Sequence, residues 1–351
     1  AIERWVRITV GIVLAATAVF LLYRLRFALI TITLAAMLAY ALLPLVDWIG
    51  RLRLAGRPVP RVGAVAFAYV LVIAVIAGVF VIATGPVSAE FQRFVQNMGQ
   101  YEVQFGTLVA NARASLDRDV PPSVRKQLDD ALNGAGMLFV NALGRVAQAA
   151  GRWLSHVVEV ILIPILAFYF LVDLPTLKQE LLEFLPSRVR ASTLEAARLA
   201  DRIVAGYVRG QLILMAISGI VVWIGLAVIG LRFPLLLGMV AGLTRAIPVV
   251  GPVFGAIPIV GLALLQSPGT AVTVLVFFVV LQLVESKFIL PQVIGHELNL
   301  HAATILLALL VGDALFGLMG MFLAAPAAAF LKEMRALAEE RVVAPGDTPA
   351  G

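Results

Sequence analysis

Four charged side chains interrupt the long apolar stretches in the second half of the sequence: Arg245, Glu285, Lys287 and Asp313. A charge at the centre of a membrane helix costs about 2.5–3.5 kcal/mol on insertion scales, so such residues usually serve a function. Arg245 could hold an anionic or hydroxyl-rich solute, while Glu285 and Asp313 could bind a proton, Na⁺ or a cationic side chain. The structural alternatives are an ion pair of Arg245 with Glu285 or Asp313, or extension of Arg245 to the cytoplasmic interface. We expect Lys287 to be interfacial.

The stretch that follows Arg245 is uncharged but broken. Residues 246–284 carry no charged side chain, and a bilayer-spanning helix needs only about 20 residues. Proline and glycine interrupt this stretch throughout, at Pro248, Gly251, Pro252, Gly255, Pro258, Gly261, Pro268 and Gly269. Interrupted backbone at membrane depth is tolerated only where protein covers it or it lines a watery cavity. Because transporters build their sites from such helices, we predict a broken transport core over residues 233–326.

Further residues complete the predicted site. On the solute or ion pathway we place, besides Arg245, Glu285 and Asp313, the residues Pro248, Gly251, Pro252 and Gln282. We assign hinge or packing roles to Gly255, Pro258, Pro291, Gly317, Gly320 and Pro326. For Gly317 and Gly320 we favour close packing of helices through small faces. Gln211 and Gln282 are also typical of polar contacts between helices.

Composition places the chain in a membrane and excludes several functions. Of its 351 residues, 61% are hydrophobic and only 14% charged, whereas soluble domains carry about 25% charged residues. The net charge is +6, but no basic stripe with stacking aromatics accompanies it, so we expect no nucleic-acid partner. There is no cysteine, and the three histidines lack metal-ligand spacing, so we expect no metal and no cofactor. Hydrolase and phosphate-loop motifs are absent, which favours a protein that is not an enzyme.

The apolar segments predict an all-α polytopic membrane protein with about eight spans. The basic loop 47–61 indicates the cytoplasmic side, which places both termini in the cytoplasm. We expect residues 1–84 to hold three spans, 153–331 to hold five, 173–209 to form cytoplasmic helices and 332–351 to be a cytoplasmic tail. The predicted spans are 5–23, 27–46, 62–84, 153–172, 210–231, 233–250, 271–286 and 301–331, with 253–266 broken or re-entrant.

Residues 85–152 are too polar to span a bilayer and predict an extracytoplasmic insertion of amphipathic helices. Apolar side chains, including Phe94 and Phe105, recur at helical spacing over residues 91–116. A stripe of this length must be covered. We expect a membrane surface or a neighbouring subunit to cover it, the alternative being that the insertion packs within its own subunit.

Four stretches resemble the autoinducer-2 exporter family of bacterial membrane proteins, the PerM-like permeases. They are Ile163-Pro164 to Asp173 with Leu185-Pro186; Gly206-Tyr207-Val208-Arg209-Gly210-Gln211; Ile247-Pro248-Val249-Val250-Gly251-Pro252 with Ile257-Pro258; and Glu285 to Pro291 with His301, Gly317-x-x-Gly320 and Pro326. Each motif is weak alone, but together they follow the family's order over most of the chain.

The resemblance implies eight membrane helices, an insertion after the third, and export of a small solute such as the quorum-sensing autoinducer across the bacterial inner membrane. It also implies a homo-oligomer, for which we expect a pentamer. Two positions depart from the family. Where Arg245 stands the family more often has an acid or amide, which argues against a Na⁺ site there, and where Asp313 stands it usually has a small residue. A swapped pair, Arg245 with Asp313, would explain both changes.

Three functions are therefore compared. The leading hypothesis is a secondary transporter or facilitator that exports a small polar solute. The second is a Na⁺(Li⁺)/H⁺ antiporter, in which Glu285 and Asp313 would titrate. The third is a non-transporting membrane scaffold that acts through its extracytoplasmic helices. The broken, glycine-rich core argues against the scaffold, because a scaffold needs no interrupted helices.

Overall fold

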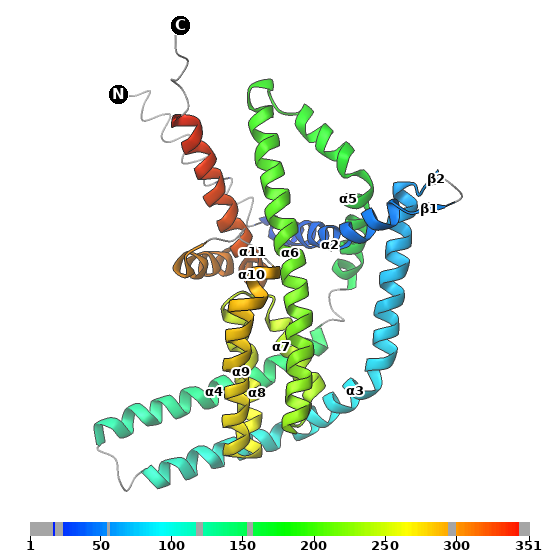
Figure 1. The fold of residues 1–351 in the computed structure, drawn as a ribbon. Coiled ribbons are helices and arrows are strands. Elements are labelled where there is room, and N and C mark those ends of the chain that lie inside the picture. The colour runs from blue at the N-terminus through cyan, green and yellow to red at the C-terminus, as the bar shows by residue number, and fades with distance from the viewer. Residues whose placement is uncertain are drawn as a thin grey trace, which may run out of the picture. The chain divides into compact units, whose positions relative to one another are not determined.

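The computed structural model describes residue 17 and residues 24–54, 57–116, 122–152, 157–293 and 300–343. Apart from one short β-hairpin, these ranges are mostly helical, which confirms the predicted all-α polytopic fold (Figure 1). The predicted first span and the end of the tail lie outside them. The elements are α2 Arg26–Gly50, β1 Arg53–Leu54, β2 Arg57–Pro58, α3 Arg61–Leu116, α4 Pro122–Arg152, α5 Val157–Glu183, α6 Ser187–Ile229, α7 Pro234–Thr244, α8 Val250–Gln266, α9 Pro268–Val284, the π-helix η2 Glu285–Ile289, α10 Leu290–Val293 and α11 Ala302–Val343.

Within the described ranges, five helical segments are long and apolar enough to cross a membrane: Ala28–Gly50, Arg61–Gly78, Val189–Ile229, Pro268–Gln292 and Ala303–Leu337. Three shorter apolar helices accompany them: Ile161–Asp173, Pro234–Thr244 and Val250–Gln266. Helix α6 begins at Ser187 in the predicted cytoplasmic segment 173–209 and continues without a break into the predicted fifth span, over 43 residues in all. The predicted sixth span, residues 233–250, is instead an 11-residue helix followed by a break.

The chain forms two compact units. The first comprises Ala1–Ala68, Val158–Val208 and Glu297–Gly351, and the second comprises Tyr69–Val157 and Arg209–His296. In the first unit, Tyr207 of α6 is almost fully buried against Met37 of α2 and Ala325 of α11. Its hydroxyl donates to the Phe322 carbonyl at 2.9 Å, which satisfies the polar end of a side chain whose ring is otherwise apolar.

The predicted last span is broken inside this first unit. Gly317 of α11 has φ 60° and ψ −141°, a conformation outside the helical region that glycine adopts without a Cβ clash. Beyond it the chain folds back, so that a Cβ on Gly320 would lie 1.8 Å from the Gly312 carbonyl oxygen. Gly317 is therefore the bend, and Gly320 makes the close packing contact that the sequence favoured for both residues.

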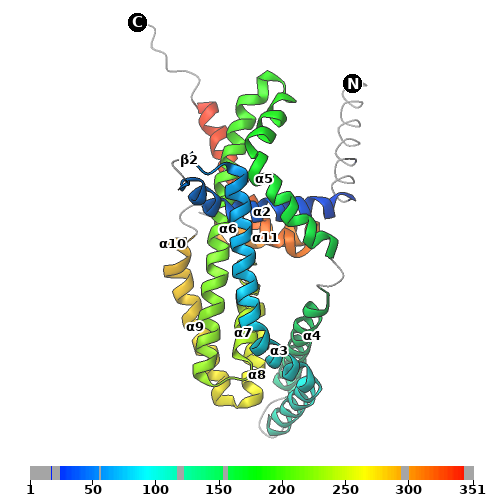
Figure 2. The same ribbon diagram turned by 90° about the vertical axis from the view of Figure 1, so that its right-hand side faces the viewer.

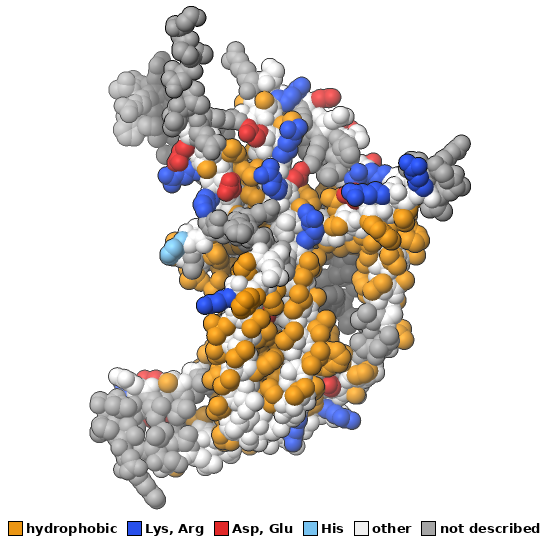
Figure 3. All heavy atoms as spheres, in the orientation of Figure 1, with side chains coloured by type: hydrophobic (Ala, Val, Ile, Leu, Met, Phe, Trp, Pro, Cys, Tyr) orange, Lys and Arg blue, Asp and Glu red, His pale blue; other side chains and the backbone are white. Residues whose placement is uncertain are grey.

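In the second unit, α8 and α9 lie side by side, as both views show (Figures 1 and 2). The turn between them follows from the sequence: Ser267 is extended, its Oγ accepts from the Thr270 N–H at 3.0 Å, and Pro268 occupies the first helical position. Over α8, α9 and the 209–229 part of α6 the surface in Figure 3 is apolar and nearly free of charge. Leu275, Val276 and Val279 are each more than half exposed there, as a lipid-facing surface requires.

The amphipathic insertion packs into the core of the second unit. Helix α3 does not end at residue 84 but continues through Pro86 to Leu116. Phe94 is 1% exposed and meets Phe233 edge to face, and Phe105 stacks on Phe139 of α4 with ring centroids 4.7 Å apart. The expectation that a membrane surface or neighbouring subunit covers these two aromatics is therefore wrong. The chain itself covers them. The covering residues lie in α8, in α9 and in the segment that joins α6 to α7.

Candidate functional site

Helix α7 ends immediately before Arg245 and is held directly against α6. A Cβ on Gly238 would lie 2.6 Å from the Cβ of Trp223, and a Cβ on Gly242 would lie 3.0 Å from the Cα of Gly219. At the other end of α7, the Glu90 carboxylate of α3 accepts from the Leu236 N–H at 2.8 Å. Small residues and an anchored N-terminus thus fix the short helix at whose C-terminal end Arg245 lies.

The backbone breaks immediately after Arg245. Val249 has φ 64°, which is rare for a β-branched residue, and such strain costs about 1–3 kcal/mol. Gly251 allows the chain to return close to α7, because a Cβ there would lie only 1.8 Å from the Thr244 carbonyl oxygen. The Arg245 carbonyl, left free at the helix end, accepts a hydrogen bond from the side-chain amide of Gln211 in α6. The predicted interruption at Pro248 and Gly251 is therefore present.

Arg245 forms a buried ion pair with Glu285. Its Nη1 lies 2.8 Å from Glu285 Oε2, and the two side chains are 2% and 4% exposed. The other Glu285 oxygen accepts from Ser218 Oγ at 2.6 Å, and Nη1 also donates to Gln282 Oε1 at 2.9 Å. Helices α6, α7 and α9 with η2 thus contribute to one polar network inside an apolar unit. Desolvation of both charges is costly, and this geometry offsets it only while the pair is intact.

The π-helix η2 begins at Glu285. In this segment Glu285 is buried, while Ser286 and Lys287 are exposed. Single π-turns within helices occur frequently at functional sites. Here the turn brings the Glu285 carboxylate to the inner face and leaves the Lys287 side chain outside.

One donor of the buried guanidinium has no acceptor. Within the described residues, Arg245 Nε is buried and makes no hydrogen bond. Because a guanidinium carries N–H donors on all three nitrogens and accepts nothing, Nε can bind only an acceptor such as a hydroxyl, carbonyl or carboxylate oxygen. The described residues contain no group of three or more His, Asp or Glu side chains that could hold a metal ion.

The structure brings some predicted residues together and separates others. Gln282 joins the ion pair, and Gly255 packs against α7, where a Cβ would lie 2.5 Å from Thr244 Oγ1. Of the two acidic partners that the sequence left open for Arg245, the structure pairs it with Glu285. Asp313 is exposed on α11 in the other compact unit. The remaining predicted residues lie in α8 (Pro252, buried Pro258), α10 (Pro291) and α11 (Gly317, Gly320, buried Pro326).

Sequence reasoning did not identify Ser218, which is fully buried and bonded to Glu285. A signal was available. Ser218 follows Gln211 by seven residues, two turns of α6, so both side chains lie on the same helical face in an otherwise apolar span. Two polar residues at that spacing could have indicated a polar stripe that faces a buried charge.

Comparison with known proteins gives one consistent result. A sequence model of the family described as "AI-2E family transporter" matches residues 10–338. The chain is 28% identical over 305 residues to "Putative transport protein YrrI" of Bacillus subtilis, covering 87% of this chain and 85% of that protein. It is 24% identical over 326 residues to "Putative transport protein MT0215" of Mycobacterium tuberculosis, covering 91% and 86%. It is also 29% identical over 181 residues to "Putative permease PerM" of Escherichia coli, about half of each chain.

Proposed function

The chain belongs to the AI-2E family of transporters, and from this premise we propose that it carries a small, hydroxyl-rich solute out of the cell across the bacterial inner membrane. The family and the apolar helices make it a multi-pass membrane transporter. The relatives bear transport or permease names, in keeping with a role other than catalysis. Neither the comparisons nor the site geometry favours exchange of Na⁺ for protons, so we do not propose it.

The observation that supports this solute class is the compensated charge of Arg245. Glu285 neutralises the guanidinium, so the pair adds no net charge to the site. An anionic solute would have to displace Glu285, which would leave a buried carboxylate without its cation. A hydroxyl oxygen can instead accept from the unpartnered Nε without breaking the ion pair. A neutral polyol-like solute therefore fits the network better than an anion of the same size.

Transport by the purified protein in liposomes tests the proposal. We expect flux of the neutral polyol glucitol to exceed that in protein-free liposomes, and flux of gluconate, its carboxylate counterpart of equal chain length, to stay at background. Repeating the assay with an imposed pH or Na⁺ gradient separates facilitated from coupled transport. Gluconate flux at or above that of glucitol would contradict the assignment of a neutral solute.

The orientation in the membrane is part of the same proposal, with the insertion outside the cell and both termini in the cytoplasm. Because the chain has no cysteine, single cysteines report their side without background labelling. Gln104→Cys on the insertion should react with an impermeant thiol reagent on intact spheroplasts, and Ala191→Cys at the start of α6 only after lysis; both positions are exposed. The reverse pattern would show the opposite orientation.

A further inference from the structure

A polar cavity lies where α2 ends and α3 begins. It has a volume of about 340 Å³, and its lining includes Asp47, Arg51 and Arg61. One apolar span ends at Gly50 and the next begins at Arg61, so the cavity lies at the ends of two membrane spans. In a bilayer this is the depth of the lipid headgroups, outside the hydrocarbon core of about 30 Å.

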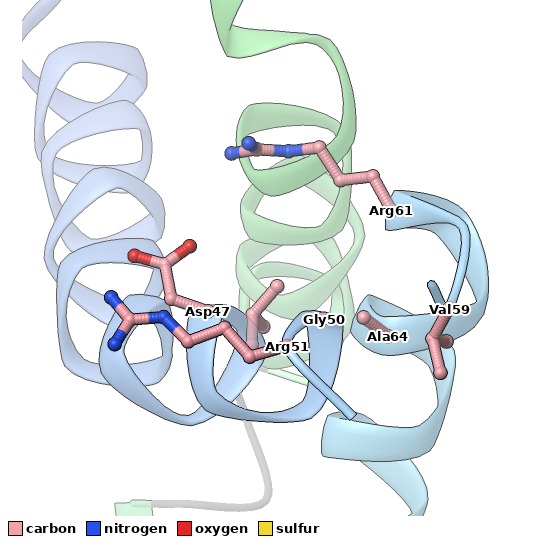
Figure 4. A pocket seen from close by; sticks show the side chains of 7 residues that line it. Asp47, Gly50, Arg51, Val59, Arg61 and Ala64 are labelled. Atoms are coloured by element: carbon pink, nitrogen blue, oxygen red, sulfur yellow. The ribbon is translucent and has the colours of Figure 1, made fainter. Parts of the chain in front are cut away.

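Two guanidinium groups give this cavity the chemistry of an anion site. Arg61 Nε donates to the Leu171 carbonyl of α5 at 2.6 Å, which fixes the side chain while its Nη donors make no bond to the described residues. Arg51 makes no side-chain bond or ion pair among the described residues. Figure 4 shows the Arg51 and Arg61 side chains extending to the same side, with the Asp47 carboxylate beside Arg51. The three groups sum to one positive charge, and a planar guanidinium is suited to the paired oxygens of a phosphate.

The residues next in sequence to the charged lining residues have exposed apolar side chains, as a lipid site requires. Trp48 is 58% exposed, Val62 is 54% exposed and Leu52 is 41% exposed. Tryptophan is typical of the membrane–water interface. The first backbone hydrogen bond of α3 runs from the Ala64 N–H to the Pro60 carbonyl. The N–H groups that precede Ala64 at the start of this helix have no acceptor within it, so they add to the positive potential at the cavity. An anion held at this cavity would therefore have aliphatic and aromatic surface next to it.

We propose that the Arg51–Arg61 cavity binds the phosphate headgroup of an anionic phospholipid, with the acyl chains lying on the apolar surface around Trp48 and Val62. The geometry favours a lipid over a soluble anion, because cationic and apolar groups occur together at headgroup depth. The site is separate from the Arg245 network and does not depend on the transported solute. Its occupant would join the end of α2 to the start of α3 and thereby stabilise the hairpin between them.

Binding of short-chain lipids to the purified, delipidated full chain tests this proposal. The probes are dioctanoyl phosphatidylglycerol, dioctanoyl phosphatidylcholine and inorganic phosphate, measured by native mass spectrometry and by the shift of the thermal unfolding midpoint. We expect phosphatidylglycerol to bind more tightly than either other probe. Arg51→Gln should weaken it about tenfold or more, the range for loss of a hydrogen bond to a charged group. The Arg51 side chain has no bonded partner among the described residues, so its removal should leave the lipid-free midpoint unchanged.

Arg53→Gln is the matched control, since it removes the same charge from the same loop at a position that does not line the cavity. At 0.5 M salt its long-range effect is screened and binding should change by about twofold or less, whereas the Arg51→Gln loss should persist. Arg61→Lys, which keeps the charge but not the fork, should also weaken binding. Equal losses in Arg51→Gln and Arg53→Gln would overturn the proposal, as would equal binding of phosphatidylcholine. Inorganic phosphate that binds as tightly as the lipid would identify a soluble anion instead.

Discussion

Arg245→Ala is expected to abolish solute transport and to lower the free energy of unfolding by about 3–5 kcal/mol, the usual cost of leaving one member of a buried ion pair alone. The substitution removes the cation from the buried Glu285 carboxylate, which would keep only the bond from Ser218. It also removes the Nε donor that we assign to the solute. Transport in liposomes and thermal unfolding of the same preparation measure the two effects together.

A double variant separates transport from stability. In Arg245→Met with Glu285→Gln, both charges are replaced by side chains of similar length, and such replacements of buried pairs are often neutral or stabilising. We expect stability near that of the wild type and no transport, because the guanidinium is gone. Wild-type transport by the double variant would contradict a role for Arg245 in solute binding and leave it as a structural ion pair.

Two further variants test whether the effects depend on the guanidinium group and on burial of the ion pair. Arg245→Lys should restore part of the stability but little transport, because lysine supplies the charge without the planar set of donors. Arg335→Ala serves as the control. Arg335 also pairs with a glutamate, Glu339, but its side chain is 81% exposed and the pair lies on the surface of α11. Since exposed pairs contribute little, this variant should change neither transport nor the unfolding midpoint.

The two charged residues of this network could be identified from the sequence, but the contacts between its side chains could not. Arg245 and Glu285 were identifiable because a charge in an apolar stretch is costly, and the break was identifiable from Pro248 and Gly251. The choice of partner was not. Glu285 and Asp313 both lie in apolar segments, and only the packing of α7 against α6 and α9 brings one of them within 2.8 Å of the guanidinium. The π-turn that buries Glu285 likewise has no local sequence pattern that predicts it.

The amphipathic insertion illustrates the same limit at the level of the fold. Its apolar stripe was predictable from helical spacing, but lipid, a neighbouring subunit and the chain's own core all need the same apolar face. The chain's own core covers the stripe, and a contact between residues distant in sequence shows this: a Cβ on Gly261 of α8 would lie 2.1 Å from the ring of Phe139. Likewise the predicted third span ends at residue 84, whereas helix α3 continues through Pro86 to Leu116. A proline removes one backbone bond, and helices packed on either side can tolerate that loss.

The glycines are the other feature whose roles could not be decided from the sequence. Some of them allow two stretches of backbone to approach each other more closely than any other residue would permit. The sequence shows many glycines in the second half of the chain, and most could be helix packing or flexible joints. The structure distinguishes them by what a Cβ would meet. Gly269 has nothing nearer than Ser267 Oγ at 3.8 Å, whereas Gly251 faces the Thr244 carbonyl oxygen at 1.8 Å and its carbon at 2.8 Å. Gly251 is thus the residue that lets the chain turn closely beneath Arg245.

Gly251→Ala is therefore expected to destabilise the protein by about 3 kcal/mol or more, at or above the upper end of overpacking costs, because the opposing atoms are backbone and cannot rotate away. The turn between α7 and α8 would have to open, which moves Arg245 relative to Glu285 and should lower transport at least tenfold. Gly269→Ala is the matched control and should be neutral or slightly stabilising, since alanine favours the first turn of α9 and meets only an ordinary contact. Thermal unfolding and glucitol flux, measured for both variants, check the two effects. Wild-type stability and flux in Gly251→Ala would mean that the break relaxes without moving the guanidinium, and that α7 alone fixes the position of Arg245.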